Sequence, residues 1–321
     1  MLKTYHLSRS SHSEVMYRSE SDLIIGFNYL IYSALETDSS ILADGFIPTH
    51  HHQIARCDSP EELNKRHRYA YTRYFNAKYH RKGSLGERKG FILELNGLYH
   101  TQTALTYVIR QGLHHGYTST PFEYPYCSVN AYFRKELGRS DNPVLIMDEK
   151  RHRFFPRNAK MPSEFRMAEN GLLLREDVLD TSYVESVYVS PRNFLFQMNR
   201  ISNDKIINDQ ISESSSPPIT LDAIEKGAPD FNPAKVFIDE AGRVNHNIMN
   251  DIELCHIIDD LILPAQYFKE GQDSSIYLLP ENKRRDLGNR IWQETRMARS
   301  SGSLFSGRII TESQLKRCLV I

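Results

Sequence analysis

The sequence predicts an α+β fold, in which helices pack on a central antiparallel sheet and a mainly helical C-terminal extension follows. Three observations support this prediction. The chain has 321 residues, which is enough for roughly two domains. Hydrophobic residues make up 40% of it, so most of the chain can bury a core. Within residues 1–140, predicted strands and helices alternate in the order β-α-β-β-α-β-α.

The elements of this first part follow from apolar spacing and from turn residues. Leu23, Phe27 and Leu30 recur at helical spacing and predict an amphipathic helix. The predicted strands are 3–9, 40–47, 50–57 and 85–95, and the predicted helices are 20–36, 60–79 and 100–115. We therefore expect four strands and three helices before residue 140.

The second of these helices has a well-marked start. Ser59 can act as its N-cap, Pro60 suits the first helical position, and Glu62 completes a capping box. The helix is expected to end before Gly83, a residue that favours a turn.

Beyond residue 140 the pattern weakens. The predicted parts of the chain are residues 1–140 as the first domain, 141–201 as a connecting segment, 202–234 as a linker rich in Ser, Asp, Asn and Pro, and 235–321 as the helical extension. Residues 248–268 and 280–300 are expected to be helical, and Thr311 is expected to cap a last helix. A recognition helix for DNA and a solvated terminal helix are both open interpretations of this tail.

Several classes of protein are excluded by composition. The longest apolar run, Leu23–Leu35, contains Asn28 and is too short to span a bilayer. The N-terminus lacks the apolar core of a signal peptide, and the four cysteines form no CxxC pair. We therefore expect a cytoplasmic protein that does not associate with a membrane. The net charge is zero, yet residues 56–90 carry ten Lys and Arg against four Asp and Glu, which favours a polyanionic partner.

Three consecutive histidines, His50, His51 and His52, lie between apolar residues where a strand is expected. Alternate side chains of a strand share a face, so His50 and His52 point together while His51 points away. Two neutral imidazoles on one strand form half of a site for a divalent metal. A solvated strand end is the alternative interpretation.

A second string, in the helix predicted over 100–115, holds Tyr107 and Gln111. They are four residues apart, so they lie on one helix face. The amide oxygen of Gln111 can supply a third metal ligand, and Tyr107 can supply a nucleophile beside it. The alternative is that Tyr107 is a core aromatic residue of an amphipathic helix.

These two segments and three others resemble the motifs of the single-tyrosine HUH transposases and occur in the same order along the chain. Within that group the resemblance is to the REP-associated tyrosine transposases. Residues 47–52 are similar to the family's Met-Pro-Asn-His-x-His, and residues 107–116 to its nucleophile helix. The other three similar segments are residues 71–76, 83–88 and 124–128, which resemble Tyr-x-x-Tyr-Phe-Asn, Gly-x-Leu-x-x-Arg and Trp-Pro-Tyr-Ser-Ser. The chain departs from the family at Thr49, where the family often has Asn, and at Gln111-Gly112-Leu113, where it usually has Asn-Pro-Val.

The resemblance implies a ferredoxin-like HUH nuclease domain that cuts and rejoins single-stranded DNA near hairpins. Tyr107 would attack the scissile phosphate and form a 5′-phosphotyrosine link. His50, His52 and Gln111 would hold Mg²⁺ or Mn²⁺, which would offset charge in the transition state.

DNA binding has a signal of its own in the basic segment. Cations that track phosphates are interleaved there with rings that can stack on unpaired bases. The candidate DNA-binding residues are Lys65, Arg66, Arg73, Arg81, Lys82 and Arg88. An amphipathic helix with its rings in the core and its cations in water is the alternative, and about half of the rings are expected in the core.

Three other functions stay open at this point. One is a hairpin-binding protein that keeps the fold without cutting DNA. Another is a metal-dependent hydrolase that uses the two histidines with a carboxylate such as Asp44. The third is a relaxase or replication-initiation type of HUH endonuclease, which commonly carries a third metal-binding histidine. A monomer and a homodimer are equally compatible with the sequence.

Overall fold

The structure is a computed structural model that describes residues 2–139, 143–199, 248–297, 304–305 and 308–321. The predicted linker, residues 202–234, lies outside these ranges. Within them, none of the helices has the length and apolar character needed to cross a membrane.

One four-stranded sheet forms the centre of the N-terminal part. Its strands are β1 (Lys3–Ser10), β2 (Ser40–Ile47), β3 (His50–Cys57) and β4 (Phe91–Glu94). They lie in the order β2-β3-β1-β4, and every neighbouring pair is antiparallel. The predicted α+β class with an antiparallel sheet is confirmed. The strand predicted over 85–95 is shorter than expected, because Gly86 adopts a left-handed turn that ties the chain to Ser10 before β4 begins.

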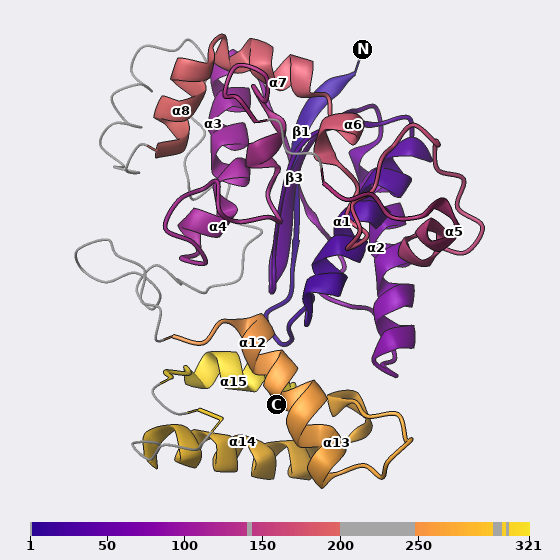
Figure 1. Cartoon of the computed structure of the whole chain (residues 1–321), viewed down its shortest axis with the longest axis vertical. Helices are drawn as coiled ribbons and strands as arrows, with labels where there is room; N and C mark the ends of the chain where they lie inside the picture. Colours follow the sequence, from indigo (N-terminus) through magenta and orange to yellow (C-terminus); the bar gives the residue numbers. More distant parts are fainter. Residues whose placement is uncertain (1, 140–142, 200–247, 298–303, 306–307) are drawn as a thin grey trace.

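Helices cover both faces of the sheet (Figure 1). On one face lie α1 (Glu20–Leu35) and α2 (Pro60–Lys78), and on the other lie α3 (Gly97–Ile109) and α4 (Gln111–His114). The faces are set by strand alternation, because Phe46 of β2 packs its ring 6.3 Å from Phe27 of α1 while its neighbour Gly45 lies against α3 and α4.

Two predicted helix details are wrong. The Ser59 side chain forms no capping hydrogen bond, and Pro60 alone marks the start of α2. The helix predicted over 100–115 is divided at Arg110, whose backbone leaves helical geometry between α3 and α4. Gly112, two residues after Arg110, packs against Tyr124, where a Cβ atom would lie 2.3 Å from the Tyr124 Cβ atom.

Residues 143–199 belong to the same core as the sheet. They contain α5 (Asp148–Arg151), η2 (His152–Phe154), α6 (Arg175–Val178), α7 (Thr181–Tyr188) and α8 (Pro191–Asn199), and η1 (Ser128–Ala131) precedes them. Leu173, Val184 and Phe194 are fully buried against the N-terminal residues. Asn28 of α1 fastens this segment by donating to the Gly171 carbonyl at 2.7 Å. The first core therefore extends past residue 140, the predicted boundary.

The C-terminal helices form a second core, as the predicted helical extension requires. They are α12 (Asp251–His256), the π-helix η3 (Ile257–Ile262), α13 (Leu263–Gln266), η4 (Ile276–Leu278), α14 (Glu281–Met297) and α15 (Glu312–Leu319). Thr311 caps α15, as predicted. The unit lies next to the N-terminal part (Figure 1). The fully buried Arg18 joins the two, with its Nε atom 2.7 Å from Oδ2 of Asp259.

Candidate active site

The three histidines of β3 divide between the two faces of the sheet. The rings of His50 and His52 lie on one face, with their centroids 5.0 Å apart. The ring of His51 lies on the other, stacked on Phe46 at 4.9 Å, and its Nδ1 atom is 2.8 Å from the Tyr17 hydroxyl. All three histidines are buried, so the solvated-strand interpretation is wrong.

Helix α3 brings Tyr107 to the face that carries His50 and His52. The Tyr107 ring is 5.2 Å from the His52 ring, and Tyr107 exposes 7% of its surface. Gln111 follows the break at Arg110 and donates from Nε2 to the Tyr107 carbonyl at 3.4 Å. This hydrogen bond orients the side-chain amide of Gln111, so that its oxygen, Oε1, remains available on the side of the histidines.

Gln111 reaches the strands because β2 has no side chain at the point of contact. Gly45 pairs with His52 in the sheet, and a Cβ atom on it would lie 2.5 Å from the Val108 carbonyl oxygen and 2.9 Å from Cγ of Gln111. Only glycine allows the helix backbone and the strand to approach this closely. The glycine thus positions Gln111 beside His50.

The hydrogen bonds of the two histidines leave the same atom of each ring available. The Nδ1 atom of His50 lies 3.0 Å from the Thr49 hydroxyl, and the Nδ1 atom of His52 lies 3.0 Å from Nε2 of His6. The remaining atoms, Nε2 of His50, Nε2 of His52 and Oε1 of Gln111, are buried and form no hydrogen bond of normal geometry with any described residue. Buried polar atoms are rarely left in this way unless a ligand completes them.

Burial holds these imidazoles in the neutral form that binds metals. It lowers the pKa of His50 to about 3, with a further contribution from His114, while the neighbouring Gln111 side chain acts in the opposite direction. The pKa of His52 is lowered well below its usual value by burial and then by His50. Neutral rings keep a lone pair for a cation down to acidic pH.

Two imidazole nitrogens and one amide oxygen fit a divalent cation of the Mn²⁺ or Mg²⁺ type. Among the described residues, no three His, Cys, Asp or Glu side chains form a group that could hold a metal, so such a site depends on Gln111. Asp44, the carboxylate of the hydrolase alternative, is fully buried in an ion pair with Arg175 at 2.8 Å. That pairing leaves Asp44 no role at the histidines.

Sequence reasoning missed two histidines of this cluster. His6 of β1 is fully buried and stacks on His52 with ring centroids 5.1 Å apart. His115 is buried with its ring 4.8 Å from the His50 ring. Strand pairing and the turn after α4 create these contacts, and neither feature has a sequence signature.

The predicted DNA-binding residues separate into two groups. Arg81 is bound within the protein, because its guanidinium pairs with Glu14 at 2.5 Å and donates to the Ser84 carbonyl. The other five are exposed or half-buried on α2 and on the loop that follows it: Lys65, Arg66, Arg73, Lys82 and Arg88. Of the rings interleaved with them, Tyr71, Phe75 and Tyr79 are core residues, Tyr74 is half-buried and Tyr69 is exposed.

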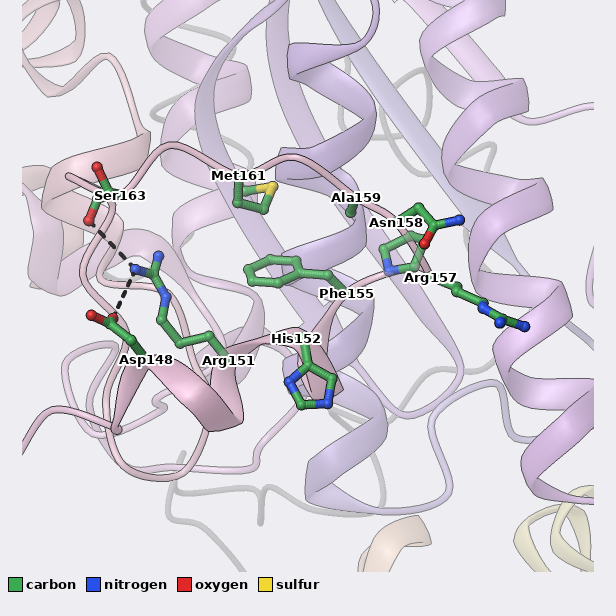
Figure 2. Close-up of a pocket in the computed structure, with 10 residues that line it drawn as sticks. Asp148, Arg151, His152, Phe155, Arg157, Asn158, Ala159, Met161 and Ser163 are labelled. Carbon is green, nitrogen blue, oxygen red and sulfur yellow. Dashed lines mark hydrogen bonds and ion pairs between the residues drawn. The ribbon is translucent and has the colours of Figure 1, made fainter.

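A groove of about 620 Å³ runs along α2, on the sheet face opposite Tyr107. Its cations are Lys65, Arg66, Arg73 and Arg157, and its rings are Tyr29, Tyr32, Tyr69 and Tyr74. Arg157 comes from the segment after η2, which also lines an adjoining hollow around Phe155 (Figure 2). In that view Arg157 extends away from Phe155 toward a neighbouring helix. No pattern in the sequence indicates that this segment packs beside α2.

Comparison with known proteins gives no matching family and one weak structural similarity. No protein-family model matches the chain, and no curated protein matches it. Among solved structures, it is similar to one described as the "REP associates tyrosine transposase bound to a REP hairpin", with a TM-score of 0.33 and 12% sequence identity. The match covers 50% of this chain and 92% of that one. The function of this chain is therefore argued from its own side chains.

Proposed function

We propose that this protein is a metal-dependent tyrosine transposase that nicks and rejoins single-stranded DNA near hairpins. The observation that carries the proposal is that Nε2 of His50, Nε2 of His52 and Oε1 of Gln111 are buried without a normal hydrogen bond to a described residue, on the sheet face that carries the ring of Tyr107. The motif order noted in the sequence and the β-α-β-β-α-β course of the sheet support the ferredoxin-like HUH domain that such chemistry implies.

In the proposed reaction, the Tyr107 oxygen attacks the scissile phosphorus in line. The bond from phosphorus to the Tyr107 oxygen forms while the bond to the 3′-oxygen breaks, and the phenol loses a proton as the leaving oxygen gains one. The product is a 5′-phosphotyrosine and a free 3′-hydroxyl, so the phosphodiester energy is kept for rejoining. A cation on His50, His52 and Gln111, when bound, would offset the charge that builds on the phosphate oxygens.

The burial of Tyr107 adds a condition to this reaction. The Tyr107 ring packs near His114, and α15 lies close enough for Arg317 to lower the pKa of His50 further. A phosphate can reach a tyrosine that is 7% exposed after the covering side chains shift. We expect DNA binding to bring about this shift, because it supplies the free energy for the rearrangement.

We assign to the groove along α2 the binding of DNA away from the scissile phosphate, because the groove lies on the sheet face opposite Tyr107. Four cationic side chains and one carboxylate, that of Glu62, line the groove, so its charge is positive. Its tyrosines offer rings on which unpaired bases can stack. Glu62 pairs with Lys65 and Arg66, while Arg73 forms no ion pair with another described residue. Arg73 and Arg157 are therefore the cations best placed to contact phosphates. Arg81 is left out of this assignment, because Glu14 holds it.

The test is a denaturing gel with end-labelled hairpin oligonucleotides, with Mn²⁺, with Mg²⁺ and with chelator. The unaltered protein should form a covalent adduct that requires the metal, and Tyr107→Phe should abolish it while DNA binding persists. Tyr99→Phe is the matched control, since Tyr99 lies at the opposite end of α3 and should be dispensable. No adduct on any hairpin, with binding retained, would favour the non-cutting alternative. An adduct in Tyr107→Phe would show that the nucleophile is another residue.

A further inference from the structure

His6 contacts one of the two candidate metal-binding histidines from the neighbouring strand. Ser8 is the residue of β1 that pairs with His52, so His6 is its diagonal neighbour on the same face. The two rings stack at an interplanar angle of 21°, and Nε2 of His6 lies 3.0 Å from Nδ1 of His52. The rings of Phe91 and Tyr107 pack edge-on against His6 at 5.6 and 6.2 Å and hold it in this place.

The direction of this hydrogen bond sets which nitrogen of His52 carries the proton. A neutral imidazole has one N–H and one lone pair, and the hydrogen bond of one nitrogen fixes the state of the other. If His52 donates from Nδ1 to His6, its Nε2 atom keeps the lone pair. That Nε2 atom is the one that is buried and without a hydrogen bond to any described residue.

The same arrangement is present at His50, where the Thr49 hydroxyl lies 3.0 Å from Nδ1 and Nε2 again has no normal hydrogen bond with the described part of the chain. The two histidines are therefore oriented alike by different partners, a neighbour in sequence for His50 and a residue of another strand for His52. Partners of this kind orient metal-binding histidines and raise the basicity of the ligating nitrogen.

We propose that His6 is a positioning residue, which accepts a hydrogen bond from Nδ1 of His52 and so directs the Nε2 lone pair toward the cation. This inference rests on the proposed function, because it concerns the same metal site. A core role alone explains His6 poorly. Its second nitrogen, Nδ1, is buried without a hydrogen bond to any residue that the structure describes, and an apolar ring would fill the space without that loss.

The experiment measures Mn²⁺ binding by titration calorimetry on the full chain. His6→Phe keeps a ring without the acceptor, and we expect it to weaken Mn²⁺ binding by roughly 10- to 100-fold. His6→Gln keeps an acceptor near the position of Nε2 and should recover most of this affinity. His67→Phe is the matched control, because His67 is an equally buried histidine on the other face of the sheet and should leave Mn²⁺ affinity unchanged.

A second measurement needs no variant. Nitrogen-15 shifts of the unaltered, metal-free protein should show His52 protonated at Nδ1 and unprotonated at Nε2. The opposite tautomer would overturn the inference, and so would equal Mn²⁺ affinities for His6→Phe and the unaltered protein. Failure of the proposed transposase function can be distinguished from failure of the role of His6. An unaltered protein that binds Mn²⁺ but forms no DNA adduct would contradict the former and leave the latter intact. An unaltered protein that binds no Mn²⁺ would overturn both.

Discussion

Replacing Gly45 with alanine tests whether the close approach of β2 to α3 and α4 maintains the candidate site. The new Cβ atom would lie 2.5 Å from the Val108 carbonyl oxygen, 2.9 Å from Cγ of Gln111 and 3.1 Å from Cβ of Gln111. Ordinary contacts of this kind are about 3.4 Å or longer, so the helix backbone or the strand must move by roughly 0.5–1 Å. Overpacking of this size costs about 1–3 kcal/mol of stability.

The same shift should change metal binding, because Gln111 is carried on the part of the chain that moves. Ligand distances tolerate deviations of about 0.2 Å, so we expect Gly45→Ala to weaken Mn²⁺ binding by at least roughly tenfold. Urea unfolding gives the change in stability, and titration calorimetry gives the change in affinity.

Gly26→Ala serves as the matched control for Gly45→Ala. Its Cβ atom would lie 2.6 Å from the Tyr17 ring, on the sheet face away from Gln111. It should lose stability without losing Mn²⁺ affinity. If both alanine variants retain full Mn²⁺ affinity, the placement of Gln111 by Gly45 is refuted.

Two further predictions concern pH and salt. Burial lowers the pKa of His6, His50 and His67 to about 3, whereas they titrate near 6.5 when unfolded. Between these values the unfolded chain binds protons that the native state does not. Stability of the metal-free protein should therefore fall as pH falls from 6.5 to 3, by up to about 1.4 kcal/mol per pH unit for each histidine. His67→Phe should reduce the slope of the unfolding free energy against pH, measured by urea unfolding, by the contribution of one histidine. An unchanged slope would contradict the lowered pKa of His67. For the groove, Arg73→Ala and Arg157→Ala should each reduce the salt slope of single-strand binding by roughly 0.7 in filter-binding assays, and unchanged slopes would exclude phosphate contacts.

The sequence predicted the N-terminal elements well because their signals are local. Strands β2 and β3 coincide with the predicted ranges, and α1 ends within one residue of its prediction. Strand alternation was sufficient to separate His51 from its two neighbours. One failure lies where tertiary packing overrides a local signal, at Arg110, where the helix is divided just before Gly112 packs on Tyr124. Ser59 forms no cap, and no contact in the structure explains this.

The same limit explains what was missed in the candidate site. Periodicity relates residues that are close in the sequence, such as Tyr107 and Gln111, but the contact between His6 and His52 depends on the register of β1 against β3. Arg157 joins the groove along α2 because residues 143–199 fold back onto α1, and their composition did not indicate that they pack in the first core.

Burial and an unbonded nitrogen do not by themselves identify a metal-binding histidine in this protein. His67 is also fully buried, and its Nδ1 atom also forms no hydrogen bond with a described residue. Its ring, however, lies among the rings of Phe46, His51 and Tyr71, and its Nε2 atom is bonded to the Gly26 carbonyl. His50 and His52 differ because their unbonded atoms share one face with the amide oxygen of Gln111. A cation there would satisfy three buried atoms at once, whereas none could do so at His67, and this difference makes the first face the candidate site.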